Sequence, residues 1–466
     1  MSAETAVQRK ETGIVLAALA DMFGNRYSAS ASVCEQHGRG EAYYEVAPPD
    51  GVVFVQSTEE VASVVKLCAE HQVPVIPFGT GTSLEGHTQA LMGGVCIDLS
   101  MMNQVVEVNA EDMDVTVQAG VTRKALNEYL RDTGLFFPID PGADASLGGM
   151  AATRASGTNA VRYGTMRENV LALTVVLADG RIIRTSRRSR KSAAGYDLTR
   201  LFVGSEGTLG VITEVTLRVY GIPDAISAAV CAFPSIEDAV NTVITTIQMG
   251  VPVARIELLD ADQLDAVNQY SGLDYAVAPT LFFEFHGTER GVAEQAEQVQ
   301  AVAGEYGATD FRWSTLAEER SKLWQARHDA YYAGLAMRPG CKAFSSDVCV
   351  PISRLAECIT ETYRDLEKSE LYCPIVGHVG DGNFHVLFIF DPEKPEQLEE
   401  AKALNERIVH RALAMDGTCT GEHGIGYGKK HFLTAEHGGD AVSVMRSLKL
   451  ALDPQNIMNP GKIVSV

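Results

Sequence analysis

The sequence predicts an α+β protein of two domains, flanked by a short N-terminal helical segment and a C-terminal segment. Its 466 residues exceed the length of one ordinary domain, and 46% hydrophobic with 21% charged residues is typical of a globular chain. Short strands with glycine-rich ends dominate up to about residue 222, and strands then alternate with longer helices. We therefore expect the chain to divide into residues 1–44, 45–222, 223–420 and 421–466.

The N-terminal segment is expected to contain a helix and a connecting loop. The apolar run at residues 13–20 follows Arg9-Lys10, but it is short and has a helical period, so we expect an amphipathic helix and not a signal peptide. Ser57-Thr-Glu-Glu60 then resembles a capping box at the start of a helix. The first domain is predicted to hold a helix at residues 122–133 and strands at residues 52–55, 73–78, 95–99, 105–108, 115–118, 170–177, 182–183 and 215–219.

The second domain is predicted to begin after Gly221-Ile-Pro223 and to contain an antiparallel sheet. Helices are expected at residues 236–249, 289–306, 316–337, 352–368 and 395–415. Strands are expected at residues 228–233, 255–259, 280–285 and 344–350, followed by a hairpin at residues 376–385.

The hairpin carries the first sign of chemistry. Asp381-Gly382 between apolar runs predicts a two-residue turn, in which His378 faces His385 with Cβ atoms about 5 Å apart. Two imidazoles on one face suit a metal site, and Glu422 would make a His-His-Glu set with His423 beside it. The same residues fit equally well a hairpin with two hydrogen-bonded histidines and no metal.

Composition excludes several classes of protein. The net charge of −21 argues against a nucleic-acid surface or charge-driven binding to an anionic membrane, and it permits a basic protein partner. The nine cysteines form no Cys-x-x-Cys pair, which indicates reduced thiols and no iron–sulfur cluster. No apolar run is long enough for a transmembrane segment. The basic stretch from Arg181 to Lys191 is expected to be a solvated loop.

Glycine-rich stretches follow several strands of the first domain. Gly79-x-Gly81 lies where backbone amides can hold a phosphate, but no Gly-Lys-Ser/Thr follows and Leu84 replaces the third glycine of a dinucleotide fingerprint. Two further stretches lie at residues 142–149 and 204–210. Three such loops indicate either a long, folded ligand bound by backbone amides or three tight turns.

These motifs together carry a family resemblance over nearly the whole chain beyond residue 40. The first domain resembles the FAD-binding domain of the vanillyl-alcohol oxidase/p-cresol methylhydroxylase superfamily, and the second resembles the C-terminal domain of FAD-linked oxidases. Within this family the chain looks most like mitochondrial-type D-lactate dehydrogenases, with D-2-hydroxyglutarate dehydrogenase and the flavin subunit of glycolate oxidase as relatives. The motifs are Pro77–Ser83, Pro141–Gly149, Gly157–Asn159, Gly164, Gly204–Gly210, Trp324–Ala330, Arg338–Ala343, Asp347–Pro351, Gly377–His385, Gly421–Gly426 and Asn459–Lys462.

The resemblance implies a PCMH-type FAD-binding domain at 45–222, an α+β substrate (cap) domain with an antiparallel sheet at 223–420, and a C-terminal segment that returns to the flavin. FAD is expected to bind non-covalently, because the setting of His87 gives no covalent signature. The diphosphate would lie on Pro77, Gly79, Thr80, Gly81, Thr82 and Ser83. The other implied contacts are Pro141, Gly148, Gly149, Ser156, Asn159, Gly164, Asn459 and Lys462 near the flavin, and Glu206, Gly210 and Ile212 near the adenosine.

In the D-2-hydroxy acid branch, the resemblance implies a divalent metal (Zn, Mn or Fe) on His378, His385 and Glu422, with His423 as catalytic base. Arg327 would bind the substrate carboxylate. The expected reaction is oxidation of D-lactate to pyruvate by hydride transfer to flavin N5. The alternatives are oxidation of D-2-hydroxyglutarate or glycolate, a metal-dependent hydrolase with the same His-His-Glu set, and a non-catalytic flavin subunit.

The resemblance also implies a partner. Electrons are expected to pass to a protein acceptor, either a cytochrome or an electron-transfer flavoprotein, because no nicotinamide fingerprint exists. The expected location is cytoplasmic. The alternative is peripheral attachment to the inner membrane through that acceptor. The sequence does not decide whether the chain forms a homodimer.

Overall fold

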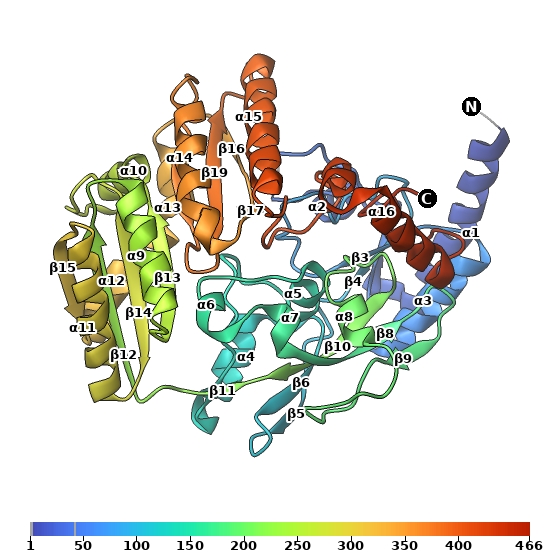
Figure 1. The fold of residues 1–466 in the computed structure, drawn as a ribbon. Coiled ribbons are helices and arrows are strands. Elements are labelled where there is room, and N and C mark those ends of the chain that lie inside the picture. The colour runs from blue at the N-terminus through green and yellow to red at the C-terminus, as the bar shows by residue number, and fades with distance from the viewer. Residues whose placement is uncertain (1–2, 42) are drawn as a thin grey trace. The chain divides into compact units, whose positions relative to one another are not determined.

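The computed structural model describes residues 3–41 and 43–466, and the chain forms two compact units (Figure 1). The first unit combines the chain up to Ser156 with Thr165–Gly221 and Glu422–Val466. The second unit combines Gly157–Gly164 with Ile222–Gly421. Residues 157–164, which fall within the predicted first domain of residues 45–222, therefore belong to the second unit. Among the described helices, none is long and apolar enough to cross a membrane.

The first unit opens with helix α1 (Ala3–Phe23), strand β1 (Tyr27–Ser28) and helix α2 (Ala31–His37). The sequence predicted the first helix but neither β1 nor α2. A four-stranded sheet follows in the order β1-β2-β4-β3, with β2 (Gly51–Phe54) and β3 (Val75–Phe78) both parallel to β4 (Val95–Asp98). Helix α3 (Thr58–Glu70) connects β2 to β3 and buries an apolar face of Val61, Val64, Val65 and Cys68.

The start of α3 differs in one detail from the predicted capping box. Ser57 is the N-cap and accepts from the backbone N–H of Glu60, as predicted. The Glu60 carboxylate, however, accepts from Gln56 N at 2.8 Å and pairs with Arg26 at 2.7 Å. In a capping box this carboxylate would accept the backbone N–H of the N-cap residue itself. Because Arg26 competes for it, the carboxylate accepts the N–H of the residue before the N-cap instead.

A second, five-stranded antiparallel sheet has the order β5-β6-β10-β8-β9. Its strands are β5 (Val105–Asn109), β6 (Asp114–Gln118), β8 (Val170–Val176), β9 (Ile182–Arg184) and β10 (Val211–Arg218). The short strands β7 (Leu135–Phe136) and β11 (Tyr220–Gly221) pair separately. The connecting helices are α4 (Arg123–Leu130), α5 (Leu147–Thr153), α7 (Met166–Asn169) and α8 (Leu198–Phe202).

The C-terminal segment belongs to the first unit. It contains α16 (Leu433–Leu452), which is interrupted at Gly438, and then an extended piece beside β3. Val75 N donates to Ile457 O at 2.8 Å, and Asn459 N donates to Val75 O at 2.8 Å. These bonds cover the outer edge of the parallel sheet, because β3 is the last strand of that sheet.

The second unit is organised around one antiparallel sheet of eight strands. Its order is β15-β12-β14-β13-β18-β19-β16, and β17 also pairs with β19. The strands are β12 (Ala225–Ala232), β13 (Val253–Leu259), β14 (Thr280–Gly287), β15 (Thr309–Ser314), β16 (Lys342–Ser345), β17 (Val348–Cys349), β18 (Ile375–Gly377) and β19 (Asn383–Phe390). The helices are α6 (Ala160–Tyr163), α9 (Ile236–Gln248), α10 (Ala261–Ser271), α11 (Glu289–Glu305), α12 (Ala317–His328), α13 (Ala330–Ala336), α14 (Leu355–Leu366) and α15 (Pro395–Ala414).

Residues 157–164 are fastened to this sheet by specific bonds. Arg162 donates to Pro252 O at 2.6 Å and to His286 O at 3.1 Å. Arg255 Nε donates to Asn159 Oδ1 at 3.1 Å. These contacts to β13 and β14 explain why the short piece is part of the second unit.

The hairpin at His378 and His385 has a different register from the predicted one. Val376 lies opposite His385, and Ile375 lies opposite Val386; the two strands are separated by five residues, 378–382, and not by two. A turn with Asp381 N bonded to His378 O at 3.0 Å forms the loop, and Gly382 ends it with φ +83°. The register has moved by two residues, and a strand alternates with a period of two, so both histidines stay on one face.

Other element predictions need smaller corrections. The helix predicted at 316–337 is two helices, because the chain turns at Asp329 between α12 and α13. The strand predicted at 344–350 is interrupted at Ser346 and Asp347, where Ser346 Oγ accepts from Val386 N at 2.8 Å. Helix α10 and strand β15 were not predicted.

Candidate functional site

The three glycine-rich loops of the first unit converge. A Cβ on Gly79 would overlap Ser146 Oγ, which joins the first loop to the second. A Cβ on Gly207 would lie 2.9 Å from Pro77 Cγ, which joins the third loop to the first. Gly204 N also donates to Ala151 O at 2.9 Å. The loops therefore form one cradle, as a single long ligand would require.

Several of these glycines are already required by the packing of the chain itself. A Cβ on Gly148 would lie 2.5 Å from Ala119 Cβ, and one on Gly210 would lie 2.7 Å from Val175 Cγ1. Gly81 has φ +71°, a conformation that residues with a Cβ rarely adopt. Part of the glycine pattern thus reflects close packing of the loops against β8 and the end of β6, which needs glycine with or without a ligand.

Buried polar atoms supply the evidence for a ligand that the glycines lack. Gln89 is 1% exposed, and neither its Nε2 nor its Oε1 has a hydrogen-bond partner among the described residues. Ser205 Oγ, in the third loop, is likewise buried without a described partner. Unsatisfied buried polar groups are costly, so a polar molecule that bonds to them would stabilise the unit. The hydroxyl, phosphate and ring amide groups of FAD fit these atoms and the surrounding backbone amides.

The predicted cofactor residues have different surroundings. Thr80 and Thr82 bond to each other through their hydroxyls at 3.3 Å, and Thr80 is exposed. Ile212 is buried in β10, opposite Val175 of β8. The first unit contains Pro77, Gly79, Thr80, Gly81, Thr82, Ser83, Pro141, Gly148, Gly149, Ser156, Glu206, Gly210, Ile212 and Asn459, and the second unit contains Asn159 and Gly164.

Glu206 and the C-terminal residues form an internal frame. Both Glu206 carboxylate oxygens accept backbone N–H groups, Ile425 N at 2.7 Å and Gly426 N at 2.8 Å. Asn459 Nδ2 donates to Glu206 O at 2.8 Å and to His87 O at 3.1 Å. The carboxylate expected near the adenosine is therefore engaged by the C-terminal loop, and the Glu206 backbone N–H also has a partner, Ala152 O at 2.9 Å.

In the second unit, His378 and His385 lie close together and are both buried. Their ring centroids are 5.4 Å apart. His378 Nδ1 lies 2.7 Å from Glu257 Oε1, and His385 Nδ1 lies 2.9 Å from Ser346 O. A carboxylate and a carbonyl can only accept, so both Nδ1 atoms carry the proton and both Nε2 atoms present a lone pair. Metal-ligating histidines are usually oriented in this way.

Glu257 connects the histidine pair to Arg327. It is fully buried on β13, and its second oxygen accepts from Arg327 Nε at 2.6 Å. Burial opposes the charged form, but the contacts with His378 and Arg327 outweigh it and hold the pKa of Glu257 below its ordinary value. Arg327 was predicted to face the substrate directly. Its Nε is committed to Glu257, so only the terminal nitrogens remain for such a contact.

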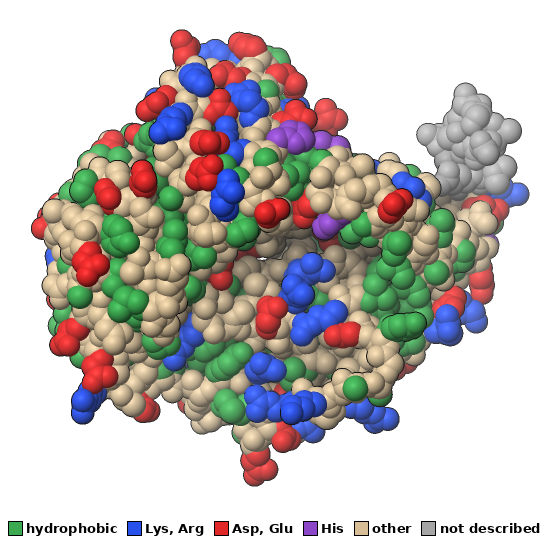
Figure 2. Space-filling view, in the orientation of Figure 1, with side chains coloured by type: hydrophobic (Ala, Val, Ile, Leu, Met, Phe, Trp, Pro, Cys, Tyr) green, Lys and Arg blue, Asp and Glu red, His purple; other side chains and the backbone are tan. Residues whose placement is uncertain are grey.

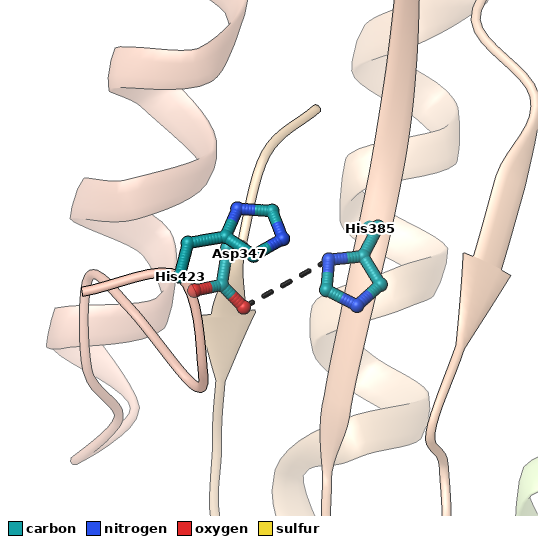
Figure 3. A group of neighbouring side chains, drawn as sticks. All are labelled: Asp347, His385 and His423. Carbon is teal, nitrogen blue, oxygen red and sulfur yellow. Dashed lines mark ion pairs between the residues drawn. The ribbon is translucent and has the colours of Figure 1, made fainter. Parts of the chain in front are cut away.

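Asp347 and Asn383 fix the end of the second unit. Asp347 is fully buried, and its Oδ1 lies 3.8 Å from His385 Nδ1 (Figure 3). The same carboxylate accepts from Asn383 Nδ2 at 3.0 Å and from Thr420 Oγ1 at 2.6 Å, and Asp347 O accepts from Gly421 N at 3.3 Å. Gly421 is therefore held beside the histidine pair, and Glu422 is the next residue in the chain.

Glu422 and His423 begin the last segment of the first unit. Within that unit, His423 Nδ1 lies 3.5 Å from Glu85 Oε1. The loop is packed closely: Gly424 has φ +84°, and a Cβ there would lie 2.7 Å from Glu206 Oε1. The glycine at position 424 thus follows from its backbone conformation and from the space available around it.

Family models assign both units. A model of the C-terminal domain of FAD-linked oxidases matches residues 222–463, and a model of an FAD-binding domain matches residues 49–186. The chain belongs to the FAD-linked oxidases. This confirms the predicted family and the FAD-binding assignment of the first domain, and makes the protein an FAD-dependent oxidoreductase.

Curated relatives and a solved structure agree with this. The FAD-linked oxidase is 58% identical to a probable mitochondrial D-lactate dehydrogenase of Danio rerio, over 94% of this chain and 89% of the relative. It is 51% identical to a mitochondrial D-lactate dehydrogenase [cytochrome] of Arabidopsis thaliana, over 92% of this chain and 76% of the relative. A crystal structure of p-cresol methylhydroxylase with substrate bound has a TM-score of 0.80 at 17% identity, covering 98% of this chain and 97% of that one. That likeness confirms the fold.

Sequence reasoning missed the carboxylates that support this FAD-linked oxidase site, namely Glu85, Glu257 and Asp347. None of them stands near the histidine that it contacts in the sequence, and only the fold brings the two together. The basic stretch from Arg181 to Lys191 is mostly exposed, as expected, although Arg188 pairs with Asp112 and Asp114. Figure 2 shows Lys and Arg side chains gathered on the face of the first unit that is turned toward the viewer.

Proposed function

We propose that this FAD-linked oxidase oxidises a D-2-hydroxy acid, in the first place D-lactate to pyruvate. The observation that carries the proposal is the pair of buried histidines, His378 and His385, whose Nδ1 atoms are both fixed by acceptors. Two oriented Nε2 lone pairs on one face suit a metal that binds a hydroxy acid. The names of the two D-lactate dehydrogenase relatives support D-lactate as the substrate.

His378, His385 and Glu422 would hold the divalent metal. The donor set of two imidazoles and one carboxylate suits Zn, Mn or Fe. Gly421 is bonded to Asp347, and a Cβ on it would come close to Asn383. Because consecutive Cα atoms are only about 3.8 Å apart, this anchor limits where Glu422 begins. A bound metal would lower the pKa of the substrate hydroxyl and orient its α-carbon.

The chain's own residues would then bind the acid and move one proton. Arg327, oriented by Glu257, would bind the substrate carboxylate through its terminal nitrogens. His423 would accept the proton of the hydroxyl group. FAD, when bound, supplies the acceptor for the two electrons and the hydrogen that leave the α-carbon. The cradle at residues 77–83, 141–149 and 204–210, with Gln89 and Ser205, would hold it non-covalently.

The electrons would next pass to a protein acceptor. One relative carries the word cytochrome in its name, and the net charge of −21 favours a basic partner. A cytochrome therefore comes before an electron-transfer flavoprotein in this proposal.

Replacement of His423 with Ala tests the central step. The variant should still bind FAD, because the predicted cofactor residues are elsewhere, but anaerobic flavin reduction by D-lactate should slow at least about 100-fold. Stopped-flow absorbance of the flavin measures this. A reduction rate equal to that of the wild type would show that His423 is not the base.

Two further measurements separate the alternatives. Steady-state rates on D-lactate, glycolate and D-2-hydroxyglutarate identify the preferred acid, and a higher kcat/KM for either of the last two would overturn D-lactate. Elemental analysis of the same sample identifies the metal. A metal-dependent hydrolase would release product without bleaching the flavin.

A further inference from the structure

Glu85 is a buried carboxylate of the first unit that contacts the loop around His423, and the proposed reaction gives it no role. It follows the predicted diphosphate loop at residues 77–83 and is 5% exposed. Its backbone oxygen accepts from Tyr427 N at 3.0 Å and from Gly428 N at 3.3 Å. The residue therefore fixes the main chain just beyond His423.

The Glu85 side chain also faces this loop. Oε1 lies 3.5 Å from His423 Nδ1 and 3.1 Å from Lys429 Nζ, and Oε2 accepts from Tyr44 OH at 3.1 Å. Burial opposes the charged form, but the charge of Lys429 and the contact with the His423 ring outweigh it and hold the pKa of Glu85 below its ordinary value. Glu85 is thus a carboxylate at neutral pH and can only accept hydrogen bonds.

We propose that Glu85 is the positioning residue for His423. Its carboxylate holds the imidazole with the proton on Nδ1, so that Nε2 presents the lone pair that accepts the substrate proton. A neutral imidazole has two tautomers of similar energy, and only one of them has an acceptor at Nε2. This inference rests on the proposed function, since it assigns Glu85 to the base of that reaction.

The surrounding loop explains why an external carboxylate is needed. Gly424 has φ +84° and Gly426 has φ +49°, so the chain around His423 adopts conformations that glycine permits. Such a backbone does not by itself select one ring orientation. Glu85 contacts both the following main chain and the imidazole, and it therefore couples the orientation of the ring to the packing of the loop.

Glu85→Gln keeps the shape of the side chain and replaces the carboxylate with an amide. The amide can donate to Nδ1 and so stabilises the wrong tautomer. We expect the limiting rate of anaerobic flavin reduction by D-lactate to fall about 100- to 1,000-fold, a loss in the range seen for misoriented catalytic histidines. The Kd of D-lactate from the flavin spectrum, the FAD content and Tm should stay near the wild-type values. Glu85→Asp, which restores the charge, should recover part of the rate.

A matched control is available in the same unit. Asp98 is also a buried carboxylate that contacts a histidine, with Oδ2 2.9 Å from His37 Nε2. Asp98→Asn should leave the rate of flavin reduction unchanged. Tyr44→Phe removes one bond to Glu85 and leaves the carboxylate, so the expected loss is only about three- to tenfold; it also tests the idea if Glu85→Gln does not fold.

The outcomes distinguish the two levels of the argument. If His423→Ala is slow and Glu85→Gln is as fast as the wild type, the positioning role is wrong. If the lower rate of Glu85→Gln is accounted for by loss of FAD or by unfolding, seen as a lower FAD content or a lower Tm, the residue is merely structural. The proposal is then overturned. If His423→Ala itself reduces the flavin at the wild-type rate, the base assignment of the proposed function fails first.

Discussion

Buried ammonium groups of this oxidase are surrounded by acceptors from distant parts of the chain. Lys449 Nζ donates to Asp453, Thr208 O and Met458 O. Lys462 is 2% exposed and donates to Gln89 O at 2.7 Å and Asn459 Oδ1 at 3.1 Å. Lys449 has a carboxylate partner within hydrogen-bond distance, whereas the two bonds of Lys462 go to neutral acceptors. Its positive charge is therefore the less well compensated of the two.

This difference gives a pH dependence of stability. Burial lowers the pKa of the Lys462 ammonium from 10.5 to about 7. Between those values the unfolded chain holds a proton that the folded chain has lost, so stability rises with pH, by at most about 1.4 kcal/mol per pH unit. Below about pH 7 both states are protonated and the contribution is flat. Thermal unfolding between pH 6 and 9 should show the rise.

Two lysine variants test its origin. Lys462→Met should flatten this rise with pH, because the ammonium of Lys462 is no longer there to titrate. Lys66→Met, which replaces an exposed lysine on α3, should keep the wild-type slope. Equal slopes in the wild type and in Lys462→Met would assign the effect to another group.

At the scale of single residues, the sequence predicted which histidines lie together, but it did not predict which carboxylates contact the histidines. His378 and His385 were predicted to lie together as directly opposed residues of a hairpin; they do lie together, but in a register shifted by two residues. Glu85 and Glu257 contact histidines 338 and 121 positions away, respectively. Many acidic residues of this chain are equally compatible with such contacts until the fold is known. Local pattern therefore predicted that the two histidines lie together, and only tertiary structure could reveal what orients them.

At the scale of elements, the loop between β18 and β19 shows how a turn is selected. The sequence Asp381-Gly382 favours a two-residue turn, yet five residues separate the two strands. Val350 N donates to Gly382 O at 3.0 Å, so a neighbouring segment holds the loop in its longer form. Tertiary contacts outside the hairpin thus determine its register, and no local rule contains them.

The same loop gives a prediction about glycine. Gly382→Ala should lower the free energy of unfolding by about 2–4 kcal/mol, because a left-handed conformation costs about 1–2 kcal/mol and the new Cβ would overlap Val350 O. Gly340→Ala is the control, since Gly340 has φ +87° but no atom within 4 Å of an added Cβ. Urea unfolding should give about 1 kcal/mol for the control. Equal losses would mean that the contact with Val350 has no cost.

Elements with a strong period or a clear cap were predicted, and weak ones were not. Helix α3 has a buried stripe and a Ser57 cap, and it was found within a residue or two. Helix α10 begins at an Asp260 cap but mixes polar and apolar residues, and strand β15 is mostly exposed. These two elements depend on packing against α13 and on pairing with β12, which the sequence does not display.

At the scale of the whole molecule, net charge should govern the encounter with an electron acceptor. The chain carries a formal charge of −21, so a basic cytochrome should be attracted over distances up to the Debye length. We expect kcat/KM for a basic cytochrome to fall at least about fivefold between 20 and 200 mM salt, because salt screens this attraction. With a small uncharged quinone as acceptor, kcat/KM should be independent of salt. A cytochrome rate that does not respond to salt would contradict electrostatic steering.

The order of the chain segments has a consequence for how the protein is made. The first unit needs residues 422–466, and Asn459 bonds to His87 O, 372 positions earlier. A ribosome must therefore release the entire second unit before the outer edge of β3 receives its last neighbour. During that interval β3 is an open edge on the nascent chain. A premature stop before residue 422 would yield a chain with every residue of the second unit and a first unit that can never close this edge.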